Sequence, residues 1–421
     1  MTKLRSFNDI DTVLKDFIPP MRSFRSVYTL DTMRALMLAL GNPQNSFKTI
    51  HVAGTSGKTS TSYYIAALLG QTGKKIGLSV SPHVDNVNER VQIDLVPLDE
   101  HEYCQQFSTF LQIINKLRIK PTYFELLIAF AFWQFAQEKV DYAVIEVGLG
   151  GLLDGTNVIE RSDKVCVIAD IGLDHVAVLG NSLAGIAAQK AGITGAENPV
   201  FCFSQSKEID RSIKEIVLAR GGEIHMQQYS GGSQNSSVLP LFQQRNFSLA
   251  YLAFQYICVR DNLTALTVEQ EVSAISTYIP GRIEVTQVHG KTLVLDAAHN
   301  AQKMGALVAS LVQKYPGKKF AVMFALMKSN DAKVNDVLSL LQPITSHLII
   351  TDFVARQDLR KHSSSPDYLA LEAKILGIPH VQIIFDTNAA YQTLLDLPGK
   401  HALITGSFYL LHDIHAKIIT R

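Results

Sequence analysis

A glycine-containing loop between a predicted strand and a predicted helix constrains the fold of this chain more than any other feature. Residues 48–53 have the pattern of a strand, and residues 58–69 have the pattern of a helix. Glycines let backbone N–H groups turn toward an anion, and the N-terminus of a helix adds positive potential. The loop therefore predicts a phosphate-binding site. Its expected binding residues are Thr55, Ser56, Gly57, Lys58 and Thr59.

The loop is not the strict G-x-x-x-x-G-K-[ST] pattern, because Val52 stands where the first glycine belongs. A Gly-Lys pair alone is a weak signal, and a structural turn is the alternative. The strand before the loop and the helix after it favour a nucleotide site. In such a site Lys58 reaches the outer phosphates, and Thr59 or Ser60 bonds a phosphate or faces Mg²⁺.

Short β-rich runs alternate with longer helical patterns along most of the chain. Residues 142–147 and 164–169 indicate buried strands by their continuous apolar content. The pattern weakens over residues 221–240, which predict a flexible surface excursion, and residues 243–259 predict a helix. After a break at Pro280-Gly281 a second α/β series begins. Its predicted strands are residues 292–295, 320–324, 347–350 and 402–404.

This alternation is typical of βαβ units and a mostly parallel sheet. A length of 421 residues fits two or three domains at ~150 residues each. We therefore predict an α/β protein of two domains. Residues 1–283 would form a P-loop-type domain with a mostly parallel sheet, and residues 284–421 a smaller Rossmann-like domain.

Composition excludes several functional classes. The chain carries 39 Lys and Arg against 38 Asp and Glu, so its net charge of +1 does not favour nucleic acid. No apolar run approaches the ~18 residues of a membrane helix, and the N-terminus lacks a signal-peptide pattern. The four cysteines lie far apart, which argues against a disulfide framework or a zinc cluster. We expect a cytoplasmic protein with small-molecule substrates and no nucleic-acid or membrane partner.

A carboxylate interrupts the apolar strand at residues 142–147. A buried Glu146 is costly unless it is paired or binds a metal, and its place near a phosphate loop favours a Mg²⁺ ligand over a salt bridge. Three other candidates stay open on their own chemistry. Ser81 before a proline is typical of a turn, His175 of a hydrogen-bonded loop, and Lys190 of a helix surface.

The short Gly-Thr-x-Gly-Lys loop resembles that of the ATP-dependent Mur ligase superfamily. Within it, the chain is similar to the folylpolyglutamate synthases, including bifunctional dihydrofolate synthases of bacterial type. The resemblance runs from about His51 to Tyr409 and depends on separated motifs in the family's order. Those motifs include Ser81-Pro82-His83, Gln189-Lys190-Ala191-Gly192-Ile193, Pro280-Gly281-Arg282, Asp296-Ala297-Ala298-His299-Asn300 and Thr405-Gly406-Ser407-Phe408-Tyr409.

The resemblance implies an ATP-dependent ligase. It would join L-glutamate to a dihydropteroate or folate carboxylate through an acyl phosphate, as a monomer with two Mg²⁺ sites. Implied metal ligands are Ser81, Glu146 and His175. Implied catalytic residues are Lys58, His175 and Lys190. The family lysine matching Lys190 is carbamylated by CO₂, which replaces a cation that would repel Mg²⁺ with an anion.

The resemblance also implies binding roles for residues in both domains. Asn246, Arg282 and Asp296 would contact the nucleotide. His299 and Ser407 would lie near the incoming glutamate. The residues implied for the pterin-bearing substrate are Thr122, Tyr123, Phe124, Glu125, Leu153, Asp154 and Gly155.

The chain departs from the family pattern at several positions. Leu152 stands where the family has an arginine, Gln189 replaces a glutamate and Phe242 replaces a histidine. These departures leave open a nucleotide-binding regulatory protein that has lost ligation. A Mur-type ligase acting on a peptidoglycan precursor is a second alternative. Only 53 residues precede Gly54, which is short for the extra domain of the Mur branch, whereas Thr59 is more typical of that branch.

Overall fold

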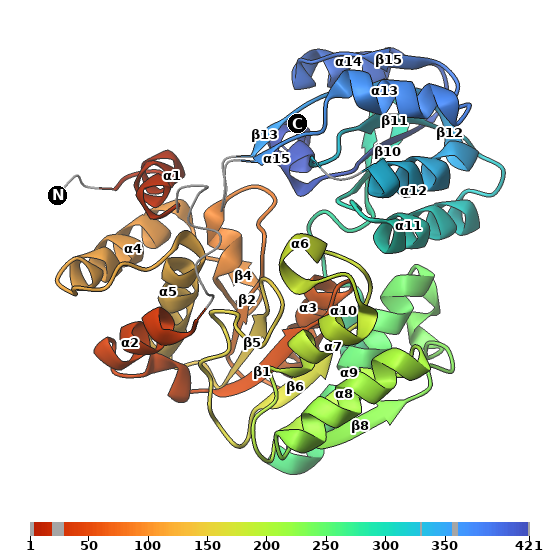
Figure 1. Cartoon of the computed structure of the whole chain (residues 1–421). Helices are drawn as coiled ribbons and strands as arrows, with labels where there is room; N and C mark the ends of the chain where they lie inside the picture. The colour runs from red at the N-terminus through yellow and green to blue at the C-terminus, as the bar shows by residue number, and fades with distance from the viewer. Residues whose placement is uncertain (1–3, 19–28, 329–330, 356–360, 420–421) are drawn as a thin grey trace. The chain divides into compact units, whose positions relative to one another are not determined.

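The computed structural model describes residues 4–18, 29–328, 331–355 and 361–419 of the chain. It divides into two compact units, residues 1–277 and 278–421. Figure 1 draws the first unit from red to green and the second from teal to blue. Each unit has its own sheet with helices around it, which confirms the predicted two-part α/β architecture. The division falls slightly before the predicted boundary at 283/284.

The first unit is built on an eight-stranded sheet in the order β4-β3-β2-β5-β1-β6-β7-β8. Strands β2, β5, β1, β6, β7 and β8 are parallel, and β3 and β4 add an antiparallel edge. The strands are β1 (Lys48–Ala53), β2 (Ile76–Ser79), β3 (Gln92–Ile93), β4 (Val96–Pro97), β5 (Tyr142–Glu146), β6 (Val165–Ile168), β7 (Pro199–Phe203) and β8 (Glu223–Gln227). The central strands are almost wholly buried, as expected for a parallel sheet covered on both faces.

Helices cover both faces of this sheet. α3 and α9 pack together, and α3 contacts β1, β2 and β5. Aromatic side chains of α4 and α5 form one large apolar cluster with β5, while α7 and α8 pack with β6 and β7. The helices are α1 (Phe7–Leu14), α2 (Asp31–Ala39), α3 (Lys58–Gly70), α4 (Glu100–Ile114), α5 (Tyr123–Gln137), α6 (Val176–Leu179), α7 (Leu183–Ala191), α8 (Lys207–Ala219), α9 (Leu241–Asp261) and α10 (Val268–Ile275).

The prediction of a flexible excursion over residues 221–240 is wrong in its first part. Glu223–Gln227 form β8, which pairs in parallel with all five residues of β7. As the edge strand, β8 pairs on one side only, and its partly buried Ile224 and Met226 pack with the α7–α8 cluster. Such a half-exposed strand carries too few apolar residues for its pattern to stand out between glycines.

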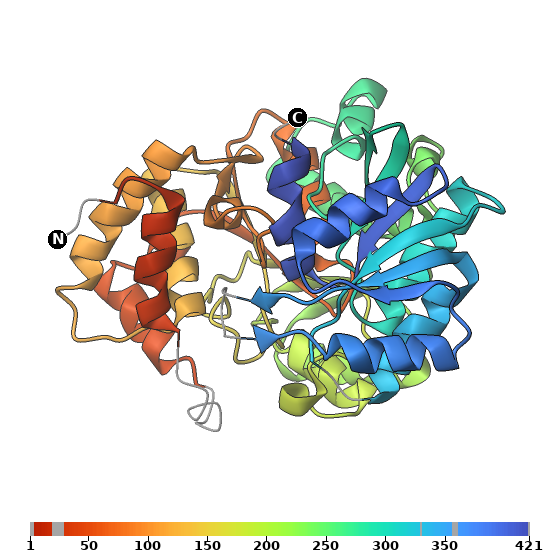
Figure 2. The same cartoon turned by 90° about the horizontal axis from the view of Figure 1, so that it is seen from above.

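The second unit has a six-stranded sheet in the order β15-β12-β11-β16-β10-β9, parallel except for β9. α11, α12 and α13 share one apolar cluster with the sheet, and Figure 2 shows helices on both of its sides. The strands of this sheet are β9 (Glu284–Val288), β10 (Lys291–Asp296), β11 (Phe320–Phe324), β12 (Thr345–Ile350), β15 (Val381–Ile383) and β16 (His401–Thr405). Two short strands, β13 (Val354–Ala355) and β14 (Lys361–His362), pair with each other in a separate antiparallel sheet. The helices are α11 (Ala301–Lys314), α12 (Asp331–Leu341), α13 (Pro366–Ile375), α14 (Thr387–Asp396) and α15 (Phe408–Ile419).

The carboxyl ends of the parallel strands position the candidate site residues. The phosphate loop follows β1, Glu146 ends β5, and Asp296 ends β10. Ligands of open α/β sheets bind at this edge, so each unit offers one such rim. None of the helices in the described part of the chain has the length and apolar character to span a membrane.

Candidate active site

Backbone hydrogen bonds attach the phosphate loop to the segment that follows the neighbouring strand β6. The N–H groups of Thr55 and Ser56 donate to the carbonyl oxygen of Asp170, at 2.7 and 3.1 Å. Gly57 caps α3 with a φ of +86°, and the N–H of Thr61 is the first to bond back into the helix. The backbone N–H groups at residues 58–60 therefore belong to the helix N-terminus, which is a ready anion site.

Asn246 lies directly against this loop. A Cβ added to Gly57 would be 2.4 Å from Asn246 Oδ1, so only glycine leaves room for that amide. The Asn246 amide nitrogen also donates to Gln243 Oε1 at 3.2 Å. The predicted nucleotide residue of α9 and the phosphate loop are thus neighbours in the structure.

A buried carboxylate connects the loop to the end of β2. Glu146 is 2% exposed; its Oε1 accepts from Thr59 Oγ1 at 2.9 Å and its Oε2 from the Ser81 N–H at 3.1 Å. The Thr59 hydroxyl, the Ser81 hydroxyl and the Glu146 carboxylate are hard oxygen donors, the kind that Mg²⁺ prefers. The chemistry of this donor set fits the predicted Mg²⁺ site.

His175 is placed less favourably as a metal ligand. It is an exposed residue with a φ of +50° that precedes the short helix α6. No group of three His, Cys, Asp or Glu side chains with the geometry of a metal site occurs in the described ranges. The structure therefore does not gather His175 into such a cluster with Glu146, and its metal role stays a prediction.

Lys190 is buried, although its position in a helix suggested an exposed side chain. It is 4% exposed near the end of α7, and its Nζ donates to the carbonyl oxygen of Gly54 at 2.8 Å. Leu152, which replaces the family arginine, packs against Gly192, the residue that caps the end of α7. The α7 lysine is thus in direct contact with the phosphate loop.

The two segments predicted to bind the pterin substrate lie side by side. Thr122 caps α5, and Glu125 completes a capping box by accepting from the Thr122 N–H at 2.8 Å. The Phe124 ring packs against Gly148 so closely that a Cβ there would be 2.4 Å from it. It also faces Gly155, which brings the start of α5 against the loop at residues 148–157.

Within that loop the predicted ligands differ in exposure. Leu153 is 42% exposed, whereas Asp154 is 5% exposed. The Asp154 carboxylate accepts from the Leu149 N–H at 2.7 Å and from the Thr156 N–H and hydroxyl at 3.0 and 2.5 Å. Burial raises the pKa of Asp154, and these hydrogen bonds and the nearby Lys58 cation oppose the rise.

Three contacts near the site were not predicted. Arg90, 3% exposed, donates through Nε to His83 Nδ1 at 2.9 Å and lies 5.5 Å from the centre of the Tyr123 ring. It therefore connects the Ser81-Pro82-His83 segment to the start of α5. A charged residue in the turn at 87–90 gave no periodic signal, because its partners are distant in sequence.

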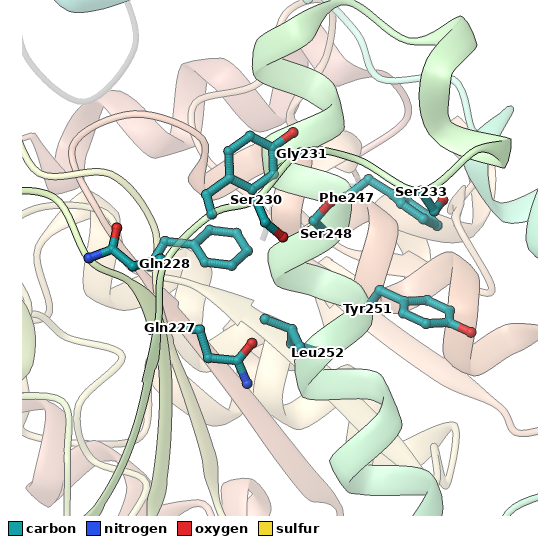
Figure 3. A pocket seen from close by; sticks show the side chains of 11 residues that line it. Gln227, Gln228, Ser230, Gly231, Ser233, Phe247, Ser248, Tyr251 and Leu252 are labelled. Carbon is teal, nitrogen blue, oxygen red and sulfur yellow. The ribbon is translucent and has the colours of Figure 1, made fainter.

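Arg245 forms a second unpredicted contact. Its Nε and Nη2 bond the Asp170 carboxylate at 2.9–3.1 Å, while its guanidinium stacks on Phe203 and Tyr229. The same rings border a pocket of about 170 Å³ between the ends of β7 and β8 and helix α9 (Figure 3). Gln227, Ser248 and Tyr251 also line this pocket. The third contact involves His51 and is described below.

In the second unit, Asp296 organises the rim of the sheet. Its carboxylate accepts from the N–H groups of Ile283 and Ala298 at 2.9 and 2.8 Å. Burial raises the pKa of Asp296, and the cations of Arg282 and Lys303 oppose the rise. The Arg282 guanidinium lies 4.6 Å from the centre of the Phe408 ring.

The predicted glutamate-site residues lie at the same rim. His299 follows β10, with Nδ1 2.8 Å from the Ala297 carbonyl oxygen and Nε2 3.0 Å from Lys303 Nζ. Its ring is 6.2 Å from that of Phe408, next to the buried Ser407. Arg282 and Lys303 supply positive charge suited to an anionic ligand such as a carboxylate.

Comparisons with known proteins agree with this architecture. Residues 52–217 match the Mur ligase middle domain, and residues 281–408 match the family described as Mur ligase, glutamate ligase domain. The dihydrofolate synthetase of Saccharomyces cerevisiae is 31% identical over 91% of this chain and 96% of its own length. The dihydrofolate synthase/folylpolyglutamate synthase of Bacillus subtilis is 28% identical over 92% of this chain and 94% of its own.

Solved structures share the fold over the whole chain. The Mycobacterium tuberculosis folylpolyglutamate synthase complexed with ADP superposes with a TM-score of 0.83, 24% identity and 99% coverage of both chains. E. coli FolC in complex with DHPP and ADP gives a TM-score of 0.83 at 21% identity, covering 100% of this chain and 99% of its own. Family models, full-length relatives and fold agree with the family identified from the sequence motifs. The chain belongs to the folylpolyglutamate synthase and dihydrofolate synthase family of Mur-type, ATP-dependent ligases.

Proposed function

We propose that this protein joins L-glutamate to the carboxylate of a pteroate or folate substrate at the expense of ATP. One observation carries the proposal: the helix N-terminus with Lys58 and the Thr59–Glu146–Ser81 oxygen cluster occupy adjacent strand ends of one sheet. The segment from Thr122 to Glu125, packed on residues 148–157, completes a rim suited to an aromatic substrate.

The chemistry proceeds in two steps. A carboxylate oxygen of the substrate attacks the γ-phosphorus of ATP, the bond to the β–γ bridging oxygen breaks, and ADP leaves. The glutamate amine then attacks the acyl phosphate carbon, phosphate leaves, and the amine proton passes to solvent as the amide forms. Phosphorylation is needed because a free carboxylate is a poor electrophile.

The chain's residues support the first step through charge and position. Backbone N–H groups at residues 58–60 and the Lys58 ammonium would hold the phosphates and stabilise the charge of the transferring phosphoryl group. Thr59, Ser81 and Glu146 would hold Mg²⁺, which supplies charge neutralisation on the phosphates when bound. In the second unit we assign nucleotide contacts to Arg282 and Asp296.

The glutamate contacts are assigned to His299 and Ser407, with Lys303 added from the structure because its ammonium lies 3.0 Å from the His299 ring. We further propose that the protein has both dihydrofolate synthase and folylpolyglutamate synthase activities, as the name of the Bacillus subtilis relative states for that protein. A monomer, a cytoplasmic location and a second Mg²⁺ bound through His175 complete the proposal.

The test is glutamate-dependent phosphate release with ATP and Mg²⁺, with dihydropteroate in one tube and tetrahydrofolate in another. We expect activity in both, products that gain one glutamate, and loss of both activities in Lys58→Ala. Lys74→Ala is the matched control, because Lys74 forms only a partly exposed ion pair with Asp141, and it should keep full activity. Activity with one substrate would remove the bifunctional assignment, and silence with both would favour a Mur-type or regulatory role.

Lys190 carries a second prediction, since we propose that CO₂ carbamylates it. A carbamate keeps one N–H on Nζ, so the modified side chain can still donate to Gly54. Lys190→Ala should lose turnover, retain ATP binding, and recover partly when acetate or formate is added. Lys190→Arg keeps a donor for Gly54 but cannot be carbamylated, so it should stay inactive; normal turnover of that variant would contradict the carbamate.

A further inference from the structure

A buried histidine lies beneath the loop that follows β5. His51 is the fourth residue of β1, three positions before the phosphate loop, and its side chain is fully buried. Its Nε2 is 2.8 Å from the hydroxyl oxygen of Thr156, which is also fully buried. The Thr156 hydroxyl in turn bonds Asp154 Oδ1 at 2.5 Å. Three side chains thus connect the central strand to the loop at residues 148–157.

Counting hydrogens gives the direction of these bonds for an ionised Asp154, the form that its hydrogen-bond donors and the nearby Lys58 cation favour against burial. Asp154 receives three donors, the N–H groups of Leu149 and Thr156 and the Thr156 hydroxyl, which is the arrangement that an ionised carboxylate accepts. The Thr156 hydroxyl has one hydrogen, and the bond to Asp154 uses it. The short contact to His51 therefore needs a hydrogen from the imidazole, which must carry it on Nε2.

The other ring nitrogen agrees with this assignment. Among the described residues, His51 Nδ1 is buried and has no hydrogen-bond partner. Nδ1 could be bare or could carry a hydrogen. The bare nitrogen is the less costly of these two states, because a buried N–H without an acceptor leaves a strong hydrogen-bond donor unsatisfied. Burial and the nearby Lys164 cation hold the pKa of His51 well below its ordinary value, so the ring stays neutral.

We propose that His51 is a positioning residue for the pterin-binding loop. By donating from Nε2 to Thr156, it directs the Thr156 hydroxyl to Asp154 and so holds the carboxylate on the Leu149 N–H. The loop at residues 148–157 then keeps Gly148 and Gly155 against the Phe124 ring. The inference depends on the proposed function, since it names the residue that shapes the pterin side of that site.

Thr49 shows what a buried polar residue of β1 looks like when it has no bond to the loop at residues 148–157. Thr49 lies two positions earlier on the same face of β1, is 1% exposed, and its buried hydroxyl has no partner among the described residues. Buried polarity on this strand is therefore not by itself a sign of a connection to the loop. His51 differs because its polar atom joins a chain of bonds that reaches a predicted substrate-binding residue.

The kinetic test compares His51→Leu with His51→Gln, whose amide can donate as Nε2 does. We expect His51→Leu to raise KM for dihydropteroate about tenfold, the size of one lost hydrogen bond to a charged network, with kcat and KM for ATP within about twofold. His51→Gln should restore most of the loss. Thr49→Val is the matched control and should leave all three parameters unchanged.

Two further readouts do not need activity. Nitrogen NMR should show a protonated Nε2 and a bare Nδ1 in His51, and a protonated Nδ1 would overturn the proposal. Backbone amides at residues 149–156 should exchange faster in His51→Leu, and also in Thr156→Val if the first variant does not fold. Unchanged exchange would overturn the positioning role, whereas an inactive wild type with the expected exchange would contradict the proposed function alone.

Discussion

At the residue scale, Gly57 decides whether the phosphate loop and α9 can touch. Its φ of +86° disfavours any side chain, and an added Cβ would lie 2.4 Å from Asn246 Oδ1. Gly57→Ala should therefore displace Asn246 and distort the helix N-terminus. We expect KM for ATP to rise at least tenfold, or about 1.4 kcal/mol, measured by steady-state phosphate release.

Gly73 provides a control for backbone strain alone. It follows α3 with a φ of +75°, and a Cβ there would meet nothing within 4 Å. Gly73→Ala should lower stability by about 1 kcal/mol and leave KM for ATP unchanged. Equal effects of the two substitutions on KM would show that the Asn246 contact has no part in nucleotide binding.

At the scale of elements, the carboxylate of Asp261 connects the end of α9 to the starts of β1 and β5. Asp261 ends α9 and bonds Lys48 at the start of β1, Tyr142 at the start of β5, and its neighbour Arg260. Burial alone would raise the pKa of Asp261, but these donors outweigh it and hold the pKa well below its ordinary value. The ionised form is therefore preferred in the folded state.

The sign of the pH dependence follows from that shift. A folded-state pKa below the unfolded value of about 3.9 stabilises the protein above pH 4, and this stabilisation disappears as the pH falls further. Asp261→Asn should lower the free energy of unfolding by about 2 kcal/mol at pH 7, measured by urea denaturation. The difference from the wild type should narrow below about pH 4.

The exposed pair Arg211–Glu215 on α8 is the matched control for this prediction. Its side chains are 80% and 60% exposed, so Glu215→Gln should change the urea midpoint by no measurable amount. A constant difference between Asp261→Asn and the wild type at all pH values would refute the electrostatic origin of the effect.

At the scale of the whole molecule, the sequence predicted the strands better than the contacts between them. β1 and β11 occupy the predicted residues. The continuous apolar run of β11 is typical of a buried strand. β8 was missed because an edge strand is paired and buried on one side only. Whether a strand lies at the edge or in the centre depends on the order of strands in the sheet. The local pattern of residues along the chain does not contain that order.

The same limit applies to the site. Lys58 and Glu146 could be found because each carries a local signal, a Gly-Lys loop or a charge inside an apolar strand. The bonds of Arg90 to His83 and of Arg245 to Asp170 depend on folding, and the burial of Lys190 depends on what α7 packs against. These contacts join residues that are distant in sequence, so composition and spacing could not predict them.

The bond between the phosphate loop and Asp170 has a consequence for how the protein meets its nucleotide. Thr55 and Ser56 already donate to that carbonyl group, and Lys190 already bonds Gly54, so protein contacts alone fix the loop. Its conformational entropy is lost once, when the chain folds, and not again at every encounter with ATP. The loop is thus preorganised for phosphate, because binding the nucleotide does not have to offset the cost of ordering this backbone.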